Sequence, residues 1–178
     1  MRIISGKYKS RRIQVPAHFK ARPTTDFAKE NLFNILNNCL EWEETAALDL
    51  FSGTGSIALE LASRGCPRVV AVEADPLHYR FICKAITTLN AQELSVLRAD
   101  VFRFLPSCSE KFDFIFADPP YNLPNLKTVP DLVLEKQLLK PDGIFVMEHS
   151  REYDFSQLPL FAELRKYGSV HFSIFENR

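Results

Sequence analysis

The sequence predicts an α/β fold in which helices cover both faces of a mostly parallel sheet. Strand and helix patterns alternate from residue 46 onward, and the strand segments are almost continuously apolar. Strands of that kind are typical of parallel sheets buried between two layers of helices. The length of 178 residues suits one ordinary domain, and 46% hydrophobic with 25% charged residues is a globular composition.

We expect a cytoplasmic monomer that contacts no membrane and holds no metal. The chain has no run of about 18 apolar residues that could span a bilayer. Residues 1–6 lack the apolar core of a secretory signal. The cysteines are widely separated and form no C-x-x-C pair, so we expect reduced thiols at all four positions: Cys39, Cys66, Cys83 and Cys108.

An uneven distribution of charge sets a basic arm, residues 1–25, apart from a main domain, residues 26–178. The arm has seven basic residues and no acidic residue, whereas the rest of the chain has 15 basic and 22 acidic residues, a net charge of −7. This separation predicts contact with a polyanion, and a solvated, mobile terminus is the alternative reading. Ile3-Ile4 and Ile13-Gln14-Val15 flank a polar turn around Gly6, which predicts a β-hairpin.

The first elements of the main domain follow from apolar spacing and from helix start and stop signals. Residues 26–38 carry an apolar stripe at helical spacing, with Thr25 as the expected cap. The apolar run Ala46–Phe51 predicts the first strand, which leads into a glycine-rich loop. The segment Thr54–Arg64 predicts the next helix, and Gly65 is its expected stop.

The later elements continue the same alternation. Further strands are expected at Val69–Glu73, Leu94–Leu97, Phe112–Ala117 and Ile144–Glu148. Further helices are expected from Asp75-Pro76 through Leu89, over Val101–Leu105, and over Asp131–Leu139 before the breaker Lys140–Gly143. Leu164–Tyr167 and Val170–Phe175 predict a closing antiparallel pair.

Carboxylates gather at one edge of the predicted sheet. Ligands of open parallel sheets bind beyond the carboxyl ends of the strands. Glu73, Asp100 and Asp118 lie at or beside such ends, and Asp49 lies just inside the end of the first strand. This clustering predicts a binding or catalytic site.

The loop from Asp49 to Ser56 matches two kinds of nucleotide-containing cofactor. Gly53, Gly55 and Ala58 fit the dinucleotide pattern G-x-G-x-x-G/A, and Glu73 follows Gly53 by 20 residues. A nicotinamide-dependent dehydrogenase is therefore one reading. However, the charge of Asp49 would repel a pyrophosphate and attract an ammonium group, which favours S-adenosylmethionine.

That cofactor has an α-ammonium group, a ribose and an adenine but no phosphate. Asp49 would favour the ammonium group, and the two glycines would admit the amino-acid part. Glu73 would accept hydrogen bonds from the ribose hydroxyls. Asp100 would accept from the adenine amino group, or it would simply cap the helix over Val101–Leu105.

The tetrapeptide Asp118-Pro119-Pro120-Tyr121 follows the strand Phe112–Ala117. The two prolines end the strand and stiffen the backbone. Asp118 and the Pro119 carbonyl could then accept both hydrogens of one exocyclic amino group, which would localise the lone pair of a weakly nucleophilic nitrogen. Tyr121 offers a face on which a flipped base can stack. The pattern predicts methyl transfer to a nucleobase amine.

Taken together, these motifs resemble the RsmD family, which methylates the N2 atom of a guanine in small-subunit (16S) ribosomal RNA. The matching stretches are Arg2–Tyr8, Arg22–Asp26, Glu30–Leu36, Asp49–Gly55 and Asp118–Tyr121. The resemblance implies a Rossmann-like class I S-adenosylmethionine-dependent methyltransferase fold, with a seven-stranded sheet and a basic amino-terminal hairpin. It also implies an assembling small ribosomal subunit as the partner. Ser52 and Ser56-Ile57 depart from the small residues usual in the family's loop.

The resemblance assigns three groups of site residues. The catalytic group is Asp118, Pro119, Pro120 and Tyr121. The cofactor-binding group is Asp49, Phe51, Ser52, Gly53, Gly55, Glu73, Ala74, Asp100 and Val101. The RNA-binding group is Arg2, Lys7, Lys9, Arg11, Arg12 and Arg22.

Three other functions stay open at this point. The tetrapeptide does not separate guanine N2 from adenine N6 or cytosine N4, so a methyltransferase acting on DNA or another RNA is an alternative. A DNA methyltransferase would need a separate DNA-recognition domain, for which 178 residues leave little room. The dehydrogenase reading lacks a substrate domain and any tyrosine–lysine or histidine relay. A non-catalytic RNA-binding protein would explain the basic arm but neither strand-end motif.

Overall fold

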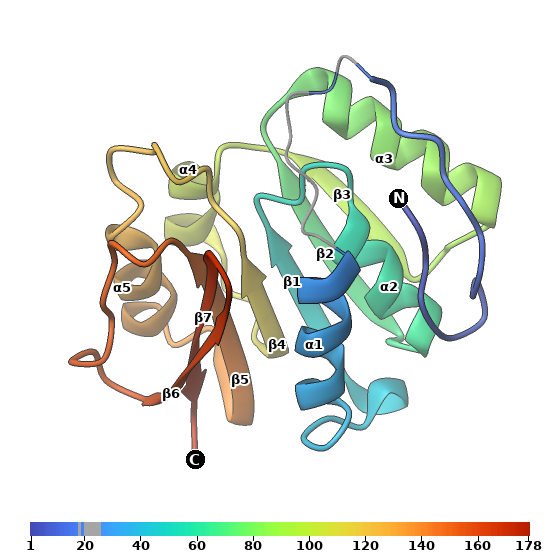
Figure 1. Ribbon diagram of the computed structural model, residues 1–178. Coiled ribbons are helices and arrows are strands. Elements are labelled where there is room, and N and C mark those ends of the chain that lie inside the picture. The colour runs from blue at the N-terminus through green and yellow to red at the C-terminus, as the bar shows by residue number, and fades with distance from the viewer. Residues whose placement is uncertain (18, 20–25) are drawn as a thin grey trace.

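The computed structural model describes residues 1–17, 19 and 26–178. Its centre is a seven-stranded sheet in the order β3-β2-β1-β4-β5-β7-β6 (Figure 1). The strands are β1 (Ala46–Leu50), β2 (Arg68–Glu73), β3 (Leu94–Arg98), β4 (Phe112–Ala117), β5 (Leu139–His149), β6 (Phe161–Tyr167) and β7 (Val170–Glu176). β1 to β5 are parallel, and β7 runs antiparallel to both β5 and β6. The predicted mostly parallel sheet is confirmed.

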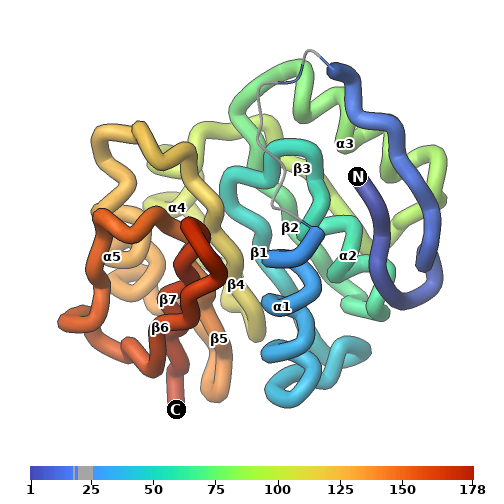
Figure 2. The backbone as a smooth tube through the Cα atoms, in the orientation of Figure 1, coloured from blue at the N-terminus to red at the C-terminus, as the bar shows by residue number. Residues whose placement is uncertain are grey.

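Helices cover the two faces of the sheet as separate layers (Figure 2). One layer contains α1 (Asp26–Leu36), α2 (Ser56–Arg64) and α3 (Pro76–Leu89), and the other contains α4 (Val101–Ser107) and α5 (Thr128–Glu135). Alternate residues of each central strand enter opposite cores: Phe114 and Phe116 pack with α1 and α2, whereas Ile115 packs with α4 and α5. This two-sided burial explains the continuously apolar strands.

The basic arm packs against α2. The amides of Ile4 and Ser5 donate to the carboxylate of Glu60 at 2.8 and 3.0 Å. At Gly6, where φ is +79°, a Cβ atom would lie 1.7 Å from the carbonyl oxygen of Ser63. The predicted hairpin is present in a short form: Arg2 and Arg12 form an antiparallel bridge, and backbone hydrogen bonds join Met1 to Ile13 and Ile3 to Ser10 and Arg11. Residues 4–8 of the arm are thus docked on α2 by hydrogen bonds, which a fully solvated terminus would lack.

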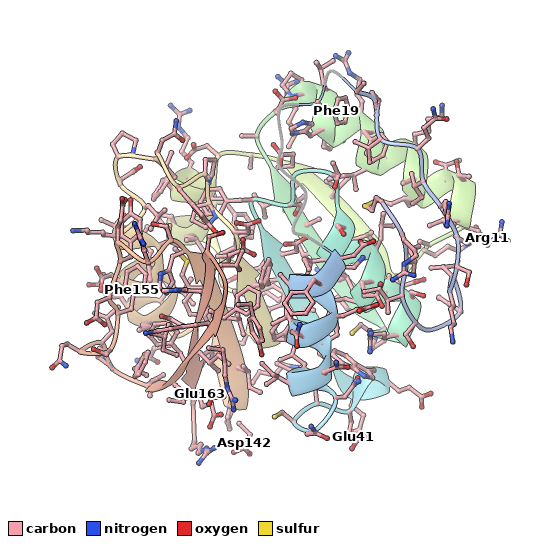
Figure 3. All side chains as sticks on the ribbon, in the orientation of Figure 1. Arg11, Phe19, Glu41, Asp142, Phe155 and Glu163 are labelled. Atoms are coloured by element: carbon pink, nitrogen blue, oxygen red, sulfur yellow. The ribbon has the colours of Figure 1, made fainter. Side chains whose placement is uncertain are left out.

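The arm then runs beside α3 toward that helix's first turns. The ring of Phe19 lies 4.6 Å from His78 and 5.3 Å from Phe81, between ring centroids. Figure 3 shows Phe19 over the start of α3 and the Arg11 side chain at the surface. Thr25, the expected cap of α1, lies outside the described residues.

Several element boundaries differ from those expected. α1 ends at Leu36, and residues 37–39 form a turn. α5 spans Thr128–Glu135 instead of residues 131–139, with Pro130 in its first turn, where a missing N–H costs nothing. β5 begins at Leu139, so the expected breaker Lys140–Gly143 lies inside the strand, where the pairing with β4 shifts register. Among the described residues, no helix is long and apolar enough to cross a bilayer.

Candidate active site

Four carboxylates lie at the carboxyl ends of four adjacent strands. In the pairing registers, Leu50 of β1 faces Val72 and Ala117, and Ala117 faces Met147 of β5. Glu73, Asp118 and Glu148 each occupy the next position, and Asp49 lies one residue before Leu50. The alternation of side chains along the strands places all four on the face covered by α1 and α2.

Asp49 is buried beneath the start of α2. Its carboxylate accepts a hydrogen bond from the amide of Ala58 at 3.1 Å, and only 2% of the residue is exposed. Burial raises the pKa of Asp49 to about 8, and the nearby charges of Asp118 and Glu73 act in the same direction. A cation placed beside this carboxyl would therefore stabilise its ionised form.

The glycine loop is held in place by Glu73. Its two carboxylate oxygens accept from the amides of Gly53 and Asp75 at 2.6 and 2.7 Å. Gly53 and Gly55 have φ values of 55° and 74°, in the left-handed region that glycine adopts without strain. Burial raises the pKa of Glu73. The loop therefore turns sharply around a buried acidic group.

The remaining predicted cofactor residues lie around this loop. Phe51 directly follows β1 and packs edge-on against Phe102, with 6.2 Å between ring centroids. Ser52 donates from Oγ to the Asp49 carbonyl at 2.8 Å. Asp100 caps α4 by accepting a hydrogen bond from the amide of Arg103. The helix-cap role, which was the alternative interpretation of Asp100, is therefore observed. Ala74 is exposed in the loop after β2, whereas Val101 is buried in the first turn of α4.

The Asp118–Tyr121 tetrapeptide leaves β4 beside the glycine loop. The amide of Asp118 donates to the Leu50 carbonyl at 3.4 Å, which ties the tetrapeptide to β1. The Tyr121 hydroxyl donates to Glu148 at 3.0 Å, and the Tyr153 hydroxyl donates to the Tyr121 carbonyl at 3.1 Å. Tyr121 is thus held at its side-chain hydroxyl and at its backbone carbonyl.

The basic residues of the arm divide into two sets. Lys7 pairs with Glu93 at 2.7 Å, and this hydrogen bond raises the pKa of Lys7. Arg2 pairs with Glu30 on α1 at 3.0 Å. Lys9, Arg11 and Arg12 are exposed, and Arg22 lies outside the described residues. Arg2 and Lys7 are exposed as well, but each is paired with a glutamate, so Lys9, Arg11 and Arg12 are the better placed to contact a polyanion.

Sequence reasoning missed two residues that organise the site. Glu148 closes the apolar run that predicts β5, so the strand-end rule that selected Glu73 and Asp118 would have found it too. Lys29 is fully buried, and its ammonium group donates to the Arg2 carbonyl at 2.7 Å and to Ser56 at 3.2 Å. No sequence pattern distinguishes this lysine from the exposed lysines of other helices.

The chemistry of the site fits a cationic, ribose-containing cofactor better than a dinucleotide. A pyrophosphate at the loop would lie near the buried carboxylates of Asp49 and Glu73, which disfavours it. An ammonium group and ribose hydroxyls suit the same carboxylates. Within the described ranges, no cluster of His, Cys, Asp and Glu side chains is arranged to hold a metal ion.

The sheet order, the closing antiparallel strand β7 and the glycine loop after β1 define the class I S-adenosylmethionine-dependent methyltransferase fold. The solved structure of YhhF from Escherichia coli has this fold, with a TM-score of 0.87 and 26% identity over 99% of this chain and 97% of that one. SMU.776, solved with S-adenosylhomocysteine, shares the fold at a TM-score of 0.68 and 14% identity over 83% of this chain and 49% of that one.

The family follows from the sequence comparisons. The chain belongs to the family described as Conserved hypothetical protein 95, whose family model matches residues 1–176. YlbH of Bacillus subtilis is 32% identical over 185 residues and covers 100% of both chains. The Escherichia coli protein named ribosomal RNA small subunit methyltransferase D is 28% identical over 159 residues, which cover 89% of this chain and 79% of that protein. The chain is therefore an S-adenosylmethionine-dependent methyltransferase of the RsmD and YhhF family.

Proposed function

We propose that this protein transfers a methyl group from S-adenosylmethionine to the N2 amino group of one guanine in 16S ribosomal RNA during assembly of the small subunit. The observation that carries the proposal is the position of Asp118–Tyr121, which lies at the strand end next to the Asp49 and Glu73 loop. Similarity to the relative named ribosomal RNA small subunit methyltransferase D supports the choice of substrate. Such a substrate implies a cytoplasmic enzyme, and we propose that it acts as a monomer.

The buried acids of the glycine loop would hold the cofactor. When bound, S-adenosylmethionine supplies a methyl group on a positively charged sulfur. Asp49 would pair with its ammonium group, and Glu73 would accept from the ribose hydroxyls while keeping its bonds to the loop amides. Asp100 would accept from the adenine amino group beside the first turn of α4. Gly53 and Gly55 would let the loop backbone approach the amino-acid part closely.

The tetrapeptide would activate the target amine. Asp118 and the Pro119 carbonyl would accept its two hydrogens, which concentrates the nitrogen lone pair toward the methyl carbon. On transfer, the nitrogen would gain a bond to the methyl carbon in place of the carbon–sulfur bond and would release one proton to solvent. Tyr121 would stack on the flipped base, and its bond to Glu148 at 3.0 Å would keep the ring in place.

The arm would hold the RNA backbone. Lys9, Arg11 and Arg12 are exposed on a segment that α2 fixes in position, so they would contact phosphates without ordering a flexible tail. Arg2 and Lys7 would add to the positive field although each pairs with a glutamate. Arg22, which lies outside the described residues, is proposed to contact RNA as well.

A methyl-transfer assay tests the proposed function. Small subunits from cells that lack this protein are incubated with the purified enzyme and labelled cofactor, and the RNA is digested for nucleoside mass spectrometry. We expect label in N2-methylguanosine at a single site. Label in N6-methyladenosine or N4-methylcytidine would assign the alternative amine, and absence of label with a tightly bound cofactor would contradict the ribosomal substrate.

A further inference from the structure

A cavity of about 320 Å³ lies between the loop after β5 and the β6–β7 pair. One wall of it is a row of side chains on three strands, because His171 of β7 faces both His149 of β5 and Lys166 of β6 in the pairing registers. Directly paired residues point to the same face of a sheet. Arg151, two positions after the end of β5, also lines the cavity. Basic side chains from separate parts of the chain therefore meet at one place.

The two permanent cations of this cavity are unpaired within the described part of the chain. Arg151 and Lys166 are exposed, and neither forms an ion pair with a described residue. Asp154 also lines the cavity, and its carboxylate accepts the Ser156 amide at 2.9 Å. Burial and the charges of Lys166 and Arg151 lower the pKa of His171. One carboxylate thus faces two cations, so the cavity has a net positive charge even when His171 is neutral.

Tyr153 connects this cavity to the tetrapeptide. It lines the cavity, and its hydroxyl donates to the Tyr121 carbonyl at 3.1 Å. Lys127 lies over the same ring, with 6.0 Å between Nζ and the ring centroid. The RNA backbone on one side of a base stacked on Tyr121 would therefore pass close to the cavity.

The basic arm and the cavity lie on opposite sides of the tetrapeptide (Figure 1). The arm packs on α2 and α3, which cover β2 and β3, whereas the cavity lies against β5, β7 and β6. The tetrapeptide follows β4, between these two groups of strands, and β6 is three strand spacings from β4, roughly 14 Å. A nucleic-acid strand with one base at Tyr121 continues on both sides of that base. The arm can hold it on one side only.

We propose that this cavity binds a backbone phosphate of the RNA substrate beside the target nucleotide. Arg151 and Lys166 would contact the phosphate oxygens, and His171 would add a third donor when it is protonated. This inference rests on the proposed function and adds a second RNA-contact surface to it. Phosphate contacts carry no sequence information, so the cavity would fix the position of the strand without choosing the base.

Binding of a short RNA tests the phosphate contact. Because such contacts are independent of sequence, the probe is a fluorescent polyuridylate of about ten nucleotides. Its anisotropy is followed during titration with the protein at several salt concentrations. For the double variant Arg151→Ala with Lys166→Ala, we expect the Kd at low salt to rise by about threefold to tenfold. The slope of log affinity against log salt should fall by up to about 0.7 for each lost charge.

Two further variants separate the cavity from net charge. Lys111→Ala with Lys136→Ala removes the same charge from exposed positions at the opposite edge of the sheet, and it should leave the wild-type slope nearly unchanged. Arg151→Lys with Lys166→Arg keeps both charges in the cavity and should bind the probe like wild type. With small subunits as substrate, the alanine double variant should raise KM and leave kcat unchanged, because a phosphate contact is equal in the ground state and the transition state.

The imidazole of His171 gives a second readout, which a change in net charge alone would not move. The charged and titratable side chains around it are those of Lys166, Arg151, His149 and Asp154. A phosphate beside this ring favours its protonated form. The polyuridylate should therefore raise the pKa of His171, measured by NMR, in the wild-type protein and less so in the alanine double variant.

The outcomes separate this inference from the proposed function. Equal Kd values and salt slopes for the alanine double variant and its control, with no response of His171, would show that the cavity does not hold RNA, and the proposed function would still stand. Wild-type protein that does not bind the probe at low salt would also overturn the inference. Loss of affinity for small subunits alone, with unchanged binding of the probe, would assign the cavity to a ribosomal protein instead. Absence of methylated guanine in any substrate would overturn the proposed function.

Discussion

Lys29 of α1 and Glu60 of α2 form an ion pair inside the protein, with 3.5 Å between Nζ and Oε2 and no exposed side-chain surface on either residue. Glu60 also accepts from two arm amides and from Arg64, and Lys29 also donates to the Arg2 carbonyl. The pair thus joins the arm to both helices.

Lys29→Met should lower the free energy of unfolding by about 3 kcal/mol, because it breaks a fully buried ion pair and leaves the Glu60 carboxylate with Arg64 as its remaining cation. Urea denaturation measures the loss, and hydrogen exchange should show faster opening at the amides of Ile4 and Ser5. Lys84→Met, at an exposed position of α3, is the matched control and should change stability by less than about 0.5 kcal/mol. The double variant with Glu60→Gln should be less destabilised than the two single effects added together. Additive effects would contradict direct pairing.

Asp118→Ala should abolish methyl transfer and leave cofactor affinity within a few-fold of wild type. The side chain is proposed to touch the amine and not the cofactor, and a transition-state hydrogen bond of this kind contributes about 2.7–4 kcal/mol. Single-turnover rates and calorimetry with S-adenosylhomocysteine measure the two effects. Asp118→Asn keeps one acceptor oxygen and should retain more activity than the alanine variant. Turnover above one-tenth of wild type in Asp118→Ala would remove Asp118 from the mechanism.

Glu73→Ala should weaken cofactor binding with little change in turnover at saturating cofactor. A ribose contact is equal in the ground state and the transition state, so its loss is a loss of uniform binding. The amides of Gly53 and Asp75 also lose their acceptor, so a drop in thermal stability should accompany the weaker binding. Calorimetry with S-adenosylhomocysteine and with a nicotinamide dinucleotide measures the change. Preference for the dinucleotide in the wild-type protein would favour a dehydrogenase.

Cofactor affinity should rise with pH between 6 and 7.5. The pKa of Asp49 is raised to about 8, so its carboxyl is mostly protonated in the free enzyme over this range. The cofactor's ammonium group, with an ordinary pKa of about 7.7–8.0, is still charged and would favour the carboxylate. Binding should then release one proton, and affinity should rise by up to about tenfold per pH unit.

Two controls isolate this effect. Asp49→Asn should bind the cofactor with a flat pH profile. 5′-Methylthioadenosine, which keeps the ribose but lacks the amino-acid part, should show a flat profile with the wild-type protein. A flat profile for S-adenosylhomocysteine with the wild-type protein would show that the ammonium group does not meet Asp49.

Replacing Lys9, Arg11 and Arg12 with alanine should weaken RNA binding and spare cofactor binding. Phosphate contacts release counterions, so the slope of log affinity against log salt should fall by up to about 0.7 per charge on single-stranded sites. The matched control removes the same charge at three exposed lysines elsewhere: Lys84, Lys111 and Lys136. Equal slopes for the two triple variants would mean that only net charge matters and that the arm has no special role.

The parts of the fold that depend on local pattern could be predicted from the sequence. Apolar runs located the strands, and Asp75-Pro76 marked the start of α3, where the Asp75 side chain caps the helix. β5 was expected to begin at Ile144 because Lys140–Gly143 reads as a turn. It begins at Leu139 because that residue pairs with Phe112 on the neighbouring strand. This pairing joins residues that are far apart in the chain, so the local sequence does not reveal it.

The candidate site, like the fold, was predictable where it depends on local sequence pattern. Strand-end carboxylates and glycine spacing identified Asp49, Glu73 and Asp118, which the structure brings to one edge of the sheet. The docking of the arm depends on amides of Ile4 and Ser5 that meet Glu60 more than 50 positions away. Backbone donors look alike in every sequence, so this contact required the structure.

α2 joins the proposed cofactor site to the basic arm. The helix has nine residues and, at 1.5 Å per residue, is about 13 Å long. The Ala58 amide near its start meets Asp49, while Glu60 and Ser63 hold the arm. Both sets of contacts thus lie on one short, buried helix. A substitution that shifts α2 would therefore disturb the glycine loop and the arm together.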